Sequence, residues 1–143
     1  MQLDLVRELS DTLLSERLEI FTPLLYQLLE SQPVGMGDGF TGQIPSGGGV
    51  YRIFETGSPV DSTVYVGKTG NFFERLYRNH LQGNQKASTL KRKLIDRGDF
   101  GSNQEVKDYF RGRCSVQFLP IDDEHLRHWF EYFAIATLKP RYN

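Results

Sequence analysis

The sequence predicts an α+β domain, with a small, mostly antiparallel three-stranded sheet flanked by helices and preceded by an N-terminal helical arm. Three observations predict this class. Apolar residues recur at three- and four-residue steps across residues 3–31, as on a helix face. Two short apolar runs, 50–54 and 63–67, flank a turn segment and predict a β-hairpin. An alternating run at 114–119 and a capped helical segment at 124–138 complete the pattern.

The arm and the segment after it form the first two regions of the chain. Residues 1–32 have the helical periodicity, and Pro23 is expected either to begin a second helix or to break the segment in two. Seven of the fourteen glycines lie between positions 35 and 49. This composition predicts a Gly/Pro-rich linker over residues 33–48, so the folded core is expected to span residues 49–143.

Three helices are predicted between the hairpin and the last strand, and the third is a short one over residues 104–110. Asn71 is the expected N-cap of the first helix, and Glu74 three residues later completes a capping-box pattern. The second helix covers about residues 87–96, has Ser88 near its start, and is basic.

Charge is distributed unevenly along the chain. The formal net charge is −1, yet residues 1–32 carry two basic and six acidic side chains, whereas residues 68–97 carry eight basic and two acidic ones. A nucleic-acid backbone attracts such local positive charge. The basic block therefore supplies predicted phosphate contacts at Arg78, Lys91 and Lys93. A solvated helix face is the alternative interpretation of the same residues.

Composition excludes several classes of protein. A chain of 143 residues suffices for one domain with a real core, and 38% hydrophobic residues is typical of globular rather than disordered proteins. No apolar run approaches the roughly 18 residues that a membrane span needs, so no membrane partner is expected. The single cysteine, Cys114, cannot form an internal disulfide, which favours a reducing, cytoplasmic setting.

Glu131 is an isolated acid in an apolar environment. It is the only carboxylate between Trp129 and Leu138, a stretch in which Trp129, Phe130 and Phe133 are predicted to anchor the core. A buried carboxylate is costly unless it is neutralised or paired with a cation. Glu131 therefore needs a metal, an arginine or a water-lined cleft, unless it lies at the edge of the apolar face with its head group in solvent.

Two tyrosines occupy equivalent positions in the predicted hairpin. Tyr51 lies in the first strand and Tyr65 in the second, each flanked by apolar residues. A buried tyrosine hydroxyl usually finds a hydrogen-bond partner. The pair can serve as ordinary core residues or as facing phenols in a site, and the hairpin alone leaves both interpretations open.

The segment after Tyr65 contains groups that suit phosphate. Lys68 lies in a turn that enters a helix, and the first turn of a helix has free N–H groups that attract phosphate. Arg75, one turn into this helix, offers a planar fork for phosphate oxygens, and His80 follows it by five residues. The spacing differs from that of a Walker loop, so this is not a nucleotide-binding loop of that kind.

Taken in order, these features resemble one known family. The chain has Gly-Val-Tyr at 49–51, Tyr-Val-Gly at 65–67, an arginine ten residues after the second tyrosine, a histidine shortly afterwards, an acid on a late apolar helix, and a Lys-Pro-Arg-Tyr-Asn ending. This combination resembles the GIY-YIG nuclease superfamily over about residues 49–143. Val50 and Val66 replace the isoleucines that name the two motifs.

The resemblance implies a metal-dependent phosphodiesterase with roles for particular residues. Glu131 would hold one divalent metal ion, Mg²⁺ or Mn²⁺. Tyr51 would activate the attacking water, Tyr65 would lie near the scissile phosphate, and Arg75 would stabilise charge on the phosphate. In the family a histidine or tyrosine usually follows the arginine by four residues, whereas His80 follows by five, which leaves its role open.

The resemblance also adds two residues to the predicted nucleic-acid contacts. Lys68 matches a position that is often basic in relatives, and Asn143 matches a typical terminal asparagine. Because free tyrosine titrates near about 10, a tyrosine base needs help to lose its proton. We expect Lys68, the basic block and the metal to lower the pKa of Tyr51.

The leading hypothesis is therefore a metal-dependent endonuclease that cuts DNA. One alternative is a catalytically silent DNA- or protein-binding module on the same fold. Another is a nuclease acting on RNA, because phosphate contacts do not by themselves read the sugar. The acidic, leucine-rich arm is a poor DNA binder. We expect it to pack on the core, to form a homodimer or to dock a partner protein.

Overall fold

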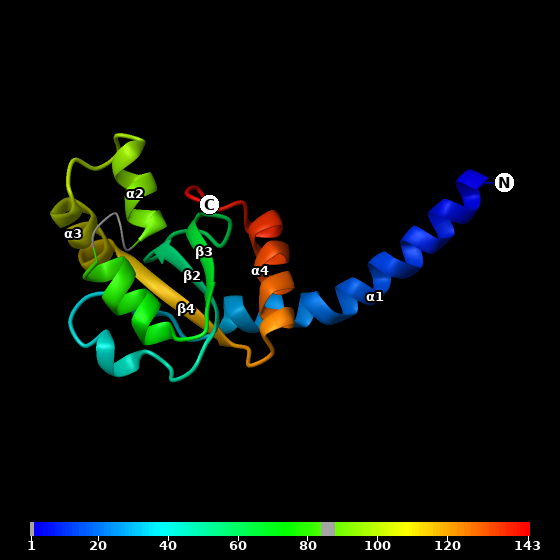
Figure 1. Ribbon diagram of the computed structural model, residues 1–143, viewed down its shortest axis with the longest axis horizontal. Coiled ribbons are helices and arrows are strands. Elements are labelled where there is room, and N and C mark those ends of the chain that lie inside the picture. Colours follow the sequence, from blue (N-terminus) through cyan, green and yellow to red (C-terminus); the bar gives the residue numbers. More distant parts are fainter. Residues whose placement is uncertain (1, 84–87) are drawn as a thin grey trace.

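The computed structural model describes residues 2–83 and 88–143, and it confirms the α+β class. A four-stranded antiparallel sheet has the strand order β1-β4-β2-β3 (Figure 1). Its strands are β1 (Val34–Gly35), β2 (Gly49–Glu55), β3 (Thr63–Thr69) and β4 (Cys114–Pro120). The helices are α1 (Gln2–Glu30), the short 3₁₀ helix η1 (Thr41–Gln43), the π-helix η2 (Phe73–Leu81), α2 (Thr89–Asp96), α3 (Asn103–Arg113) and α4 (Glu124–Leu138).

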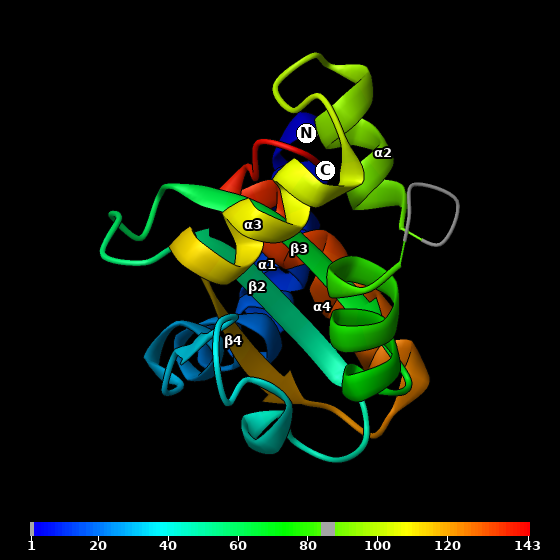
Figure 2. The same ribbon diagram turned by 90° about the vertical axis from the view of Figure 1, so that its left-hand side faces the viewer.

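The sheet separates two hydrophobic clusters, because alternate residues of each strand point to opposite faces. Figure 2 shows η2, α2 and α3 in front of the sheet, with α4 and α1 behind it. The front cluster includes Tyr51, Ile53, Leu76, Leu94, Phe110 and Phe118. The rear cluster includes Leu28, Val50, Val66, Leu119, Phe130 and Ala134.

The glycine-rich segment 33–48 is part of the folded core, and the expected linker is absent there. Its first residues form β1, which pairs with β4, so the sheet has four strands where three were predicted. Met36 and Phe40 from the same segment are buried in the front cluster. At Gly49 an added Cβ would lie 2.8 Å from the backbone nitrogen of Ile121. Glycine there allows two backbones to approach closely, which composition alone cannot distinguish from a flexible loop.

The hairpin of β2 and β3 has a different register from the expected one. Tyr51 lies opposite Gly67, and Tyr65 lies opposite Ile53. The two tyrosines are therefore diagonal neighbours on the front face, with ring centroids 6.2 Å apart, and do not form a directly opposed pair. The length of the connecting turn sets this register, and local strand pattern does not reveal it.

The arm is one helix, and Pro23 lies inside it without breaking it. The C-terminal part of α1 packs on the rear cluster through Phe21, Leu24 and Leu25, and Leu28 is fully buried there. The N-terminal part projects from the body of the protein (Figure 1).

A buried polar network fixes the end of the helix to the sheet. Gln117 of β4 donates from Nε2 to the Leu29 carbonyl at 2.7 Å, and buried Arg52 donates to Gln117 Oε1 at 2.7 Å. No helix within the described parts of the chain is both long enough and apolar enough to cross a membrane.

Candidate active site

The predicted catalytic residues come from three elements that meet at β3, the edge strand of the sheet. Tyr51 and Tyr65 belong to the hairpin, His80 and Arg75 to η2 on the front face, and Glu131 to α4, which packs on β3 from the rear. The rings of Tyr51 and Tyr65 have their centroids 5.7 and 5.6 Å from that of His80. The charges of Arg75 and Glu131 both shift the pKa of each tyrosine hydroxyl.

A buried chain of hydrogen bonds holds Tyr51. Its hydroxyl lies 2.7 Å from Nε2 of His80, and Nδ1 of His80 lies 2.7 Å from Oγ of Ser88. All three side chains are buried. Burial, followed by the positive charges of Arg75 and Lys91, lowers the pKa of His80 to about 3. The imidazole is therefore neutral at physiological pH, so one ring nitrogen carries a proton and donates a hydrogen bond, and the other accepts a hydrogen bond.

The π-helical winding of η2 explains the unusual position of His80. A π-helix closes its hydrogen bonds between residues five apart, as from Gln82 N–H to the Tyr77 carbonyl at 2.8 Å. Residues five apart therefore lie one turn apart on the same side. His80 takes the place beside Arg75 that position 79 would occupy in an α-helix. The extra residue between Arg75 and His80, compared with the family spacing, therefore does not move His80 away from Arg75.

The start of η2 is capped as predicted, but the reciprocal half of the capping box is missing. Oδ1 of Asn71 accepts the Glu74 N–H at 3.0 Å. The Glu74 carboxylate instead pairs with Arg78 at 3.0 Å, while the N–H of Asn71 donates to Oγ1 of Thr69 at 3.0 Å. The turn after β3 thus provides the cap, and Glu74 is left to pair along the helix.

Gly67 makes room for the Tyr51 ring. A Cβ at this position would lie 2.5 Å from Cζ of Tyr51 and 2.9 Å from Cε1 of Tyr65, with Oη of Tyr51 closer still. Only a residue without a side chain fits here. The glycine of the second motif therefore controls where the Tyr51 hydroxyl sits.

The pKa of Tyr51 moves in the direction opposite to the expected one. Burial raises it well above its ordinary value, and the coulombic effects of Tyr65 and Glu131 add to this, while Arg75 lowers it. Lys68 is not among the causes. The pKa of Tyr65 is also raised, first by burial and then by Glu131. Without a charge brought by substrate or metal, both phenols are protonated.

Glu131 has the character of a single-carboxylate metal ligand. It is half-buried, and burial raises its pKa while the charge of Lys68 lowers it. Within the described chain it forms no ion pair, and no group of three or more metal-ligating side chains exists there. Mg²⁺ is commonly bound by one or two carboxylates, with waters and substrate phosphate completing its shell. The residues present fit such an ion.

Comparison with known families decides the classification. A family model described as the GIY-YIG catalytic domain matches residues 47–143, well over half of the chain. This chain belongs to the GIY-YIG family. Its catalytic domain is accordingly of the nuclease type, a class of hydrolase. A search of curated proteins found no match.

Within this GIY-YIG domain, the structure corrects the expectation for Lys91. Its side chain is buried and donates from Nζ to the carbonyl oxygens of Leu81, at 2.8 Å, and Gly83. Burial, followed by the charge of Lys107, lowers the pKa of Lys91 to about 8. Lys91 thus satisfies carbonyls at the end of η2 and faces away from solvent.

The other basic residues of the block differ in exposure. Arg78 is exposed and paired with Glu74, and Lys93 is partly exposed in the last turn of α2. Lys86 and the expected first residue of that helix, Ala87, lie outside the described residues.

Asn143, a predicted nucleic-acid contact, makes two hydrogen bonds to the protein backbone. Its Oδ1 accepts the Val66 N–H at 2.8 Å, and its Nδ2 donates to the Val66 carbonyl at 2.6 Å. The preceding residue, Tyr142, donates its N–H to the Val64 carbonyl at 3.1 Å. The C-terminal segment therefore covers the free edge of β3 and holds the second motif in place.

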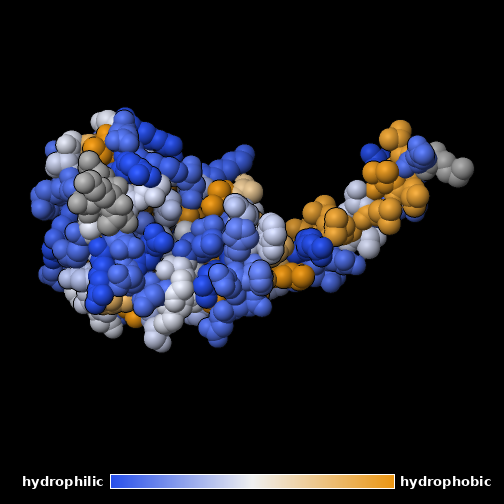
Figure 3. Space-filling view, viewed as in Figure 1, coloured by the Kyte–Doolittle hydropathy of each residue, from blue (hydrophilic) through white to orange (hydrophobic). Residues whose placement is uncertain are grey.

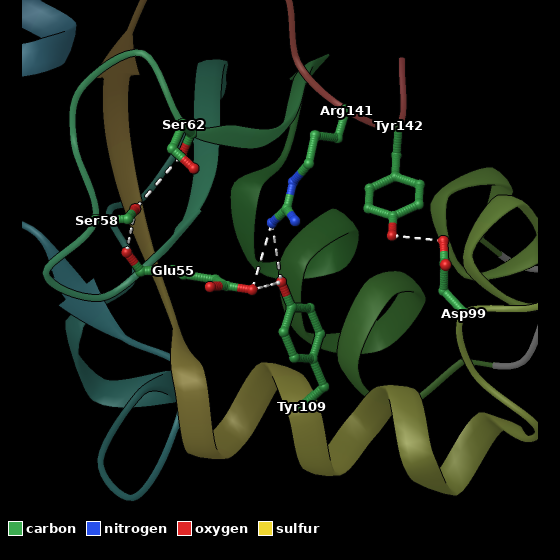
Figure 4. A network of polar contacts seen from close by, with 7 residues as sticks. All are labelled: Glu55, Ser58, Ser62, Asp99, Tyr109, Arg141 and Tyr142. Carbon is green, nitrogen blue, oxygen red and sulfur yellow. Dashed lines mark hydrogen bonds and ion pairs between the residues drawn. The ribbon is translucent and has the colours of Figure 1, made fainter.

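A polar network anchors this C-terminal segment to the rest of the GIY-YIG domain (Figure 4). The Tyr142 hydroxyl donates to Asp99 at 2.8 Å, and the Arg141 guanidinium lies 3.4 Å from Glu55. The Tyr109 hydroxyl donates to the same Glu55 carboxylate at 2.7 Å. These contacts lower the pKa of Glu55 and keep it charged, with the Tyr109 hydrogen bond as the largest cause.

Two residues behave differently from their sequence-based assignment. Trp129, predicted as a core anchor, is 58% exposed on α4, whereas Phe130 is fully buried as expected. Ser88 was predicted only to begin a helix. It accepts the Lys91 N–H as N-cap and also contacts His80. The position of Ser88 before a helix predicts its role as N-cap, but no local sequence pattern predicts its contact with His80.

Proposed function

We propose that this protein is a metal-dependent endonuclease that hydrolyses phosphodiester bonds in DNA. The observation that carries the proposal is the Tyr51 hydroxyl, held at 2.7 Å by a buried histidine, with its pKa shifted by the charges of the partly exposed Arg75 and of Glu131. This arrangement offers a proton acceptor, a phosphate-binding cation and a metal ligand on one edge of the sheet.

His80 resolves the difficulty that burial creates for a tyrosine base. In the tautomer in which Nδ1–H donates to Ser88, Nε2 can accept the Tyr51 proton. We assign to Tyr51 the removal of a proton from the attacking water while its own proton moves to His80, so no free phenolate is needed. The water oxygen then bonds to phosphorus while the P–O bond to the leaving oxygen breaks, and the leaving oxygen takes a proton from solvent.

The substrate itself makes this proton transfer more favourable. Burial is the largest cause of the low pKa of His80, and the charge of Arg75 is the next. A phosphodiester anion bound at Arg75 would offset that charge, so the imidazole would accept a proton more readily when substrate is present. The same arginine would stabilise the negative charge that develops on the phosphate.

Glu131 is the proposed ligand for Mg²⁺ or Mn²⁺. A bound ion would supply charge neutralisation at the phosphate and would favour deprotonation of water. Lys68, whose positive charge lowers the pKa of Glu131, belongs to the same neighbourhood and is a proposed phosphate contact together with Arg78 and Lys93. A reducing, cytoplasmic setting remains part of the proposal, and the buried, free Cys114 agrees with it.

Incubation with supercoiled plasmid tests the proposal. We expect nicked or linear product with Mg²⁺ or Mn²⁺, and no product with a chelator or with Glu131→Gln. Plasmid that stays supercoiled with both metals would favour a catalytically silent binding module. A labelled RNA of matching sequence, incubated in parallel, distinguishes the substrates: faster cleavage of RNA would overturn the DNA assignment.

A further inference from the structure

The projecting part of α1 exposes more apolar surface than a single copy of the protein can account for. Eight large apolar side chains between Leu3 and Ile20 are 40–85% exposed, and Figure 3 shows hydrophobic surface along the arm. They are Leu3, Leu5, Val6, Leu9, Leu13, Leu14, Leu18 and Ile20. Their exposed area is on the order of 800 Å², larger than the roughly 300–600 Å² of the largest patch on a typical monomer.

Nothing within the described chain packs against the outer half of this helix. Its residues from Gln2 to Ile20 are all exposed, although tertiary packing normally provides most of the stability of a helix in a protein. The same area is close to the roughly 800 Å² that each partner buries in a standard stable interface. An interface along the arm would therefore suffice for stable association.

An apolar groove lies where the arm joins the body. Its volume is about 560 Å³, and it is lined by Arg17, Ile20, Phe21, Leu126 and Trp129. The exposed Trp129 ring, which forms one wall, is the side chain that the sequence had predicted to be in the core. Such a groove is well suited to leucine or valine side chains from a helix laid across it.

We propose that two copies of this chain pair through α1 in an antiparallel manner, with the tip of each arm in the groove beside Trp129 of the other copy. The length of the arm supports a second copy as the occupant. A two-fold axis near position 12 places residues 3–6 of one helix opposite residues 18–21 of the other. Both grooves are then filled at once, and Leu9 and Leu13 meet their counterparts around the axis. This is the self-complementary contact that two-fold symmetry requires.

The net charge of −4 over residues 1–32, from two basic and six acidic side chains, disfavours nucleic acid as the occupant.

Sedimentation of the full chain, without DNA or metal, tests the dimer separately from nuclease activity. We expect twice the chain mass of 16.5 kDa for the wild type. Leu9→Glu and Leu13→Glu should weaken self-association at least ~10-fold, because each buries a charge in the interface. Ser15→Glu adds the same charge on the polar side of the helix and should leave the dimer intact.

The fluorescence of Trp129 tests the groove. Trp129 is the only tryptophan, so its fluorescence should shift to longer wavelength in Leu13→Glu but not in Ser15→Glu. A monomeric wild type, a dimer that survives both leucine substitutions, or an emission spectrum that stays the same when the dimer dissociates would overturn the proposal.

Discussion

Replacing Gly67 with alanine tests whether the placement of the Tyr51 hydroxyl matters, because the tyrosine itself is kept. The added Cβ would lie 2.5 Å from Cζ of Tyr51 and 2.9 Å from Cε1 of Tyr65. Since favourable carbon contacts begin at about 3.5 Å, the Tyr51 ring has to move by about 1 Å. The backbone of β3 cannot yield instead, because it pairs with β2 on one side and with the C-terminal segment on the other.

The expected effect follows from the Tyr51–His80 hydrogen bond. A shift of this size away from His80 lengthens the 2.7 Å contact to about 3.7 Å, beyond hydrogen-bonding range. Misplacement of a catalytic group by about 1 Å lowers a rate by about 100-fold. Overpacking a buried site costs about 1–3 kcal/mol of the free energy of unfolding. We therefore expect Gly67→Ala to remain folded and to lose about 100-fold in cleavage rate.

Plasmid cleavage well below the melting temperature measures the rate, and urea unfolding measures stability. Gly70→Ala is the matched control, because a Cβ there meets only the Arg127 guanidinium at 3.6 Å. It should cleave DNA within about twofold of the wild-type rate, the small effect expected where no close contact forms. Wild-type activity in Gly67→Ala would refute the argument, as would an equal loss in Gly70→Ala.

Four other substitutions address single residues of the site. Tyr51→Phe should abolish cleavage but leave DNA affinity largely intact, as judged by gel shift with a chelator present; retained cleavage would exclude Tyr51 as the base. Glu131→Ala should also abolish cleavage, and raising the Mg²⁺ or Mn²⁺ concentration should not restore it; recovery at high metal would mean that another group holds the ion. His80 has a folded-state pKa of about 3, below its unfolded value, so it contributes stability that is present above about pH 6.5 and is lost as the pH falls towards 3. Urea unfolding from pH 7 to pH 4 should therefore show a loss that is about 3 kcal/mol smaller in His80→Gln than in the wild type, and parallel pH profiles would contradict the buried, neutral histidine. Asn143→Ala should lower the free energy of unfolding by about 1–2 kcal/mol through its two lost hydrogen bonds to Val66, without weakening DNA binding; a tenfold loss of affinity at unchanged stability would instead assign the residue to phosphate.

The elements and motif residues of this protein were predictable from the sequence because they depend on local signals. The helical period, the two strand runs and the helix caps each act within a few residues, and the structure confirms the hairpin, the capped final helix and the α+β class. Glu131 stood out because a lone carboxylate within an apolar helix is costly unless something binds it. Family membership followed from the order of such local features, and the family comparison confirms it.

Only the tertiary structure decided how these residues meet, because the deciding contacts join positions far apart in the chain. The π-helical winding that brings His80 to Tyr51, the burial of Lys91 and the hydrogen bonds of Asn143 to Val66 have no local signal. Burial also set the direction of the Tyr51 pKa, since desolvation outweighs the nearby positive charge. Trp129 is exposed for a related reason. The elements that pack against a helix determine which of its faces is buried, and the apolar residues of the helix do not determine this by themselves.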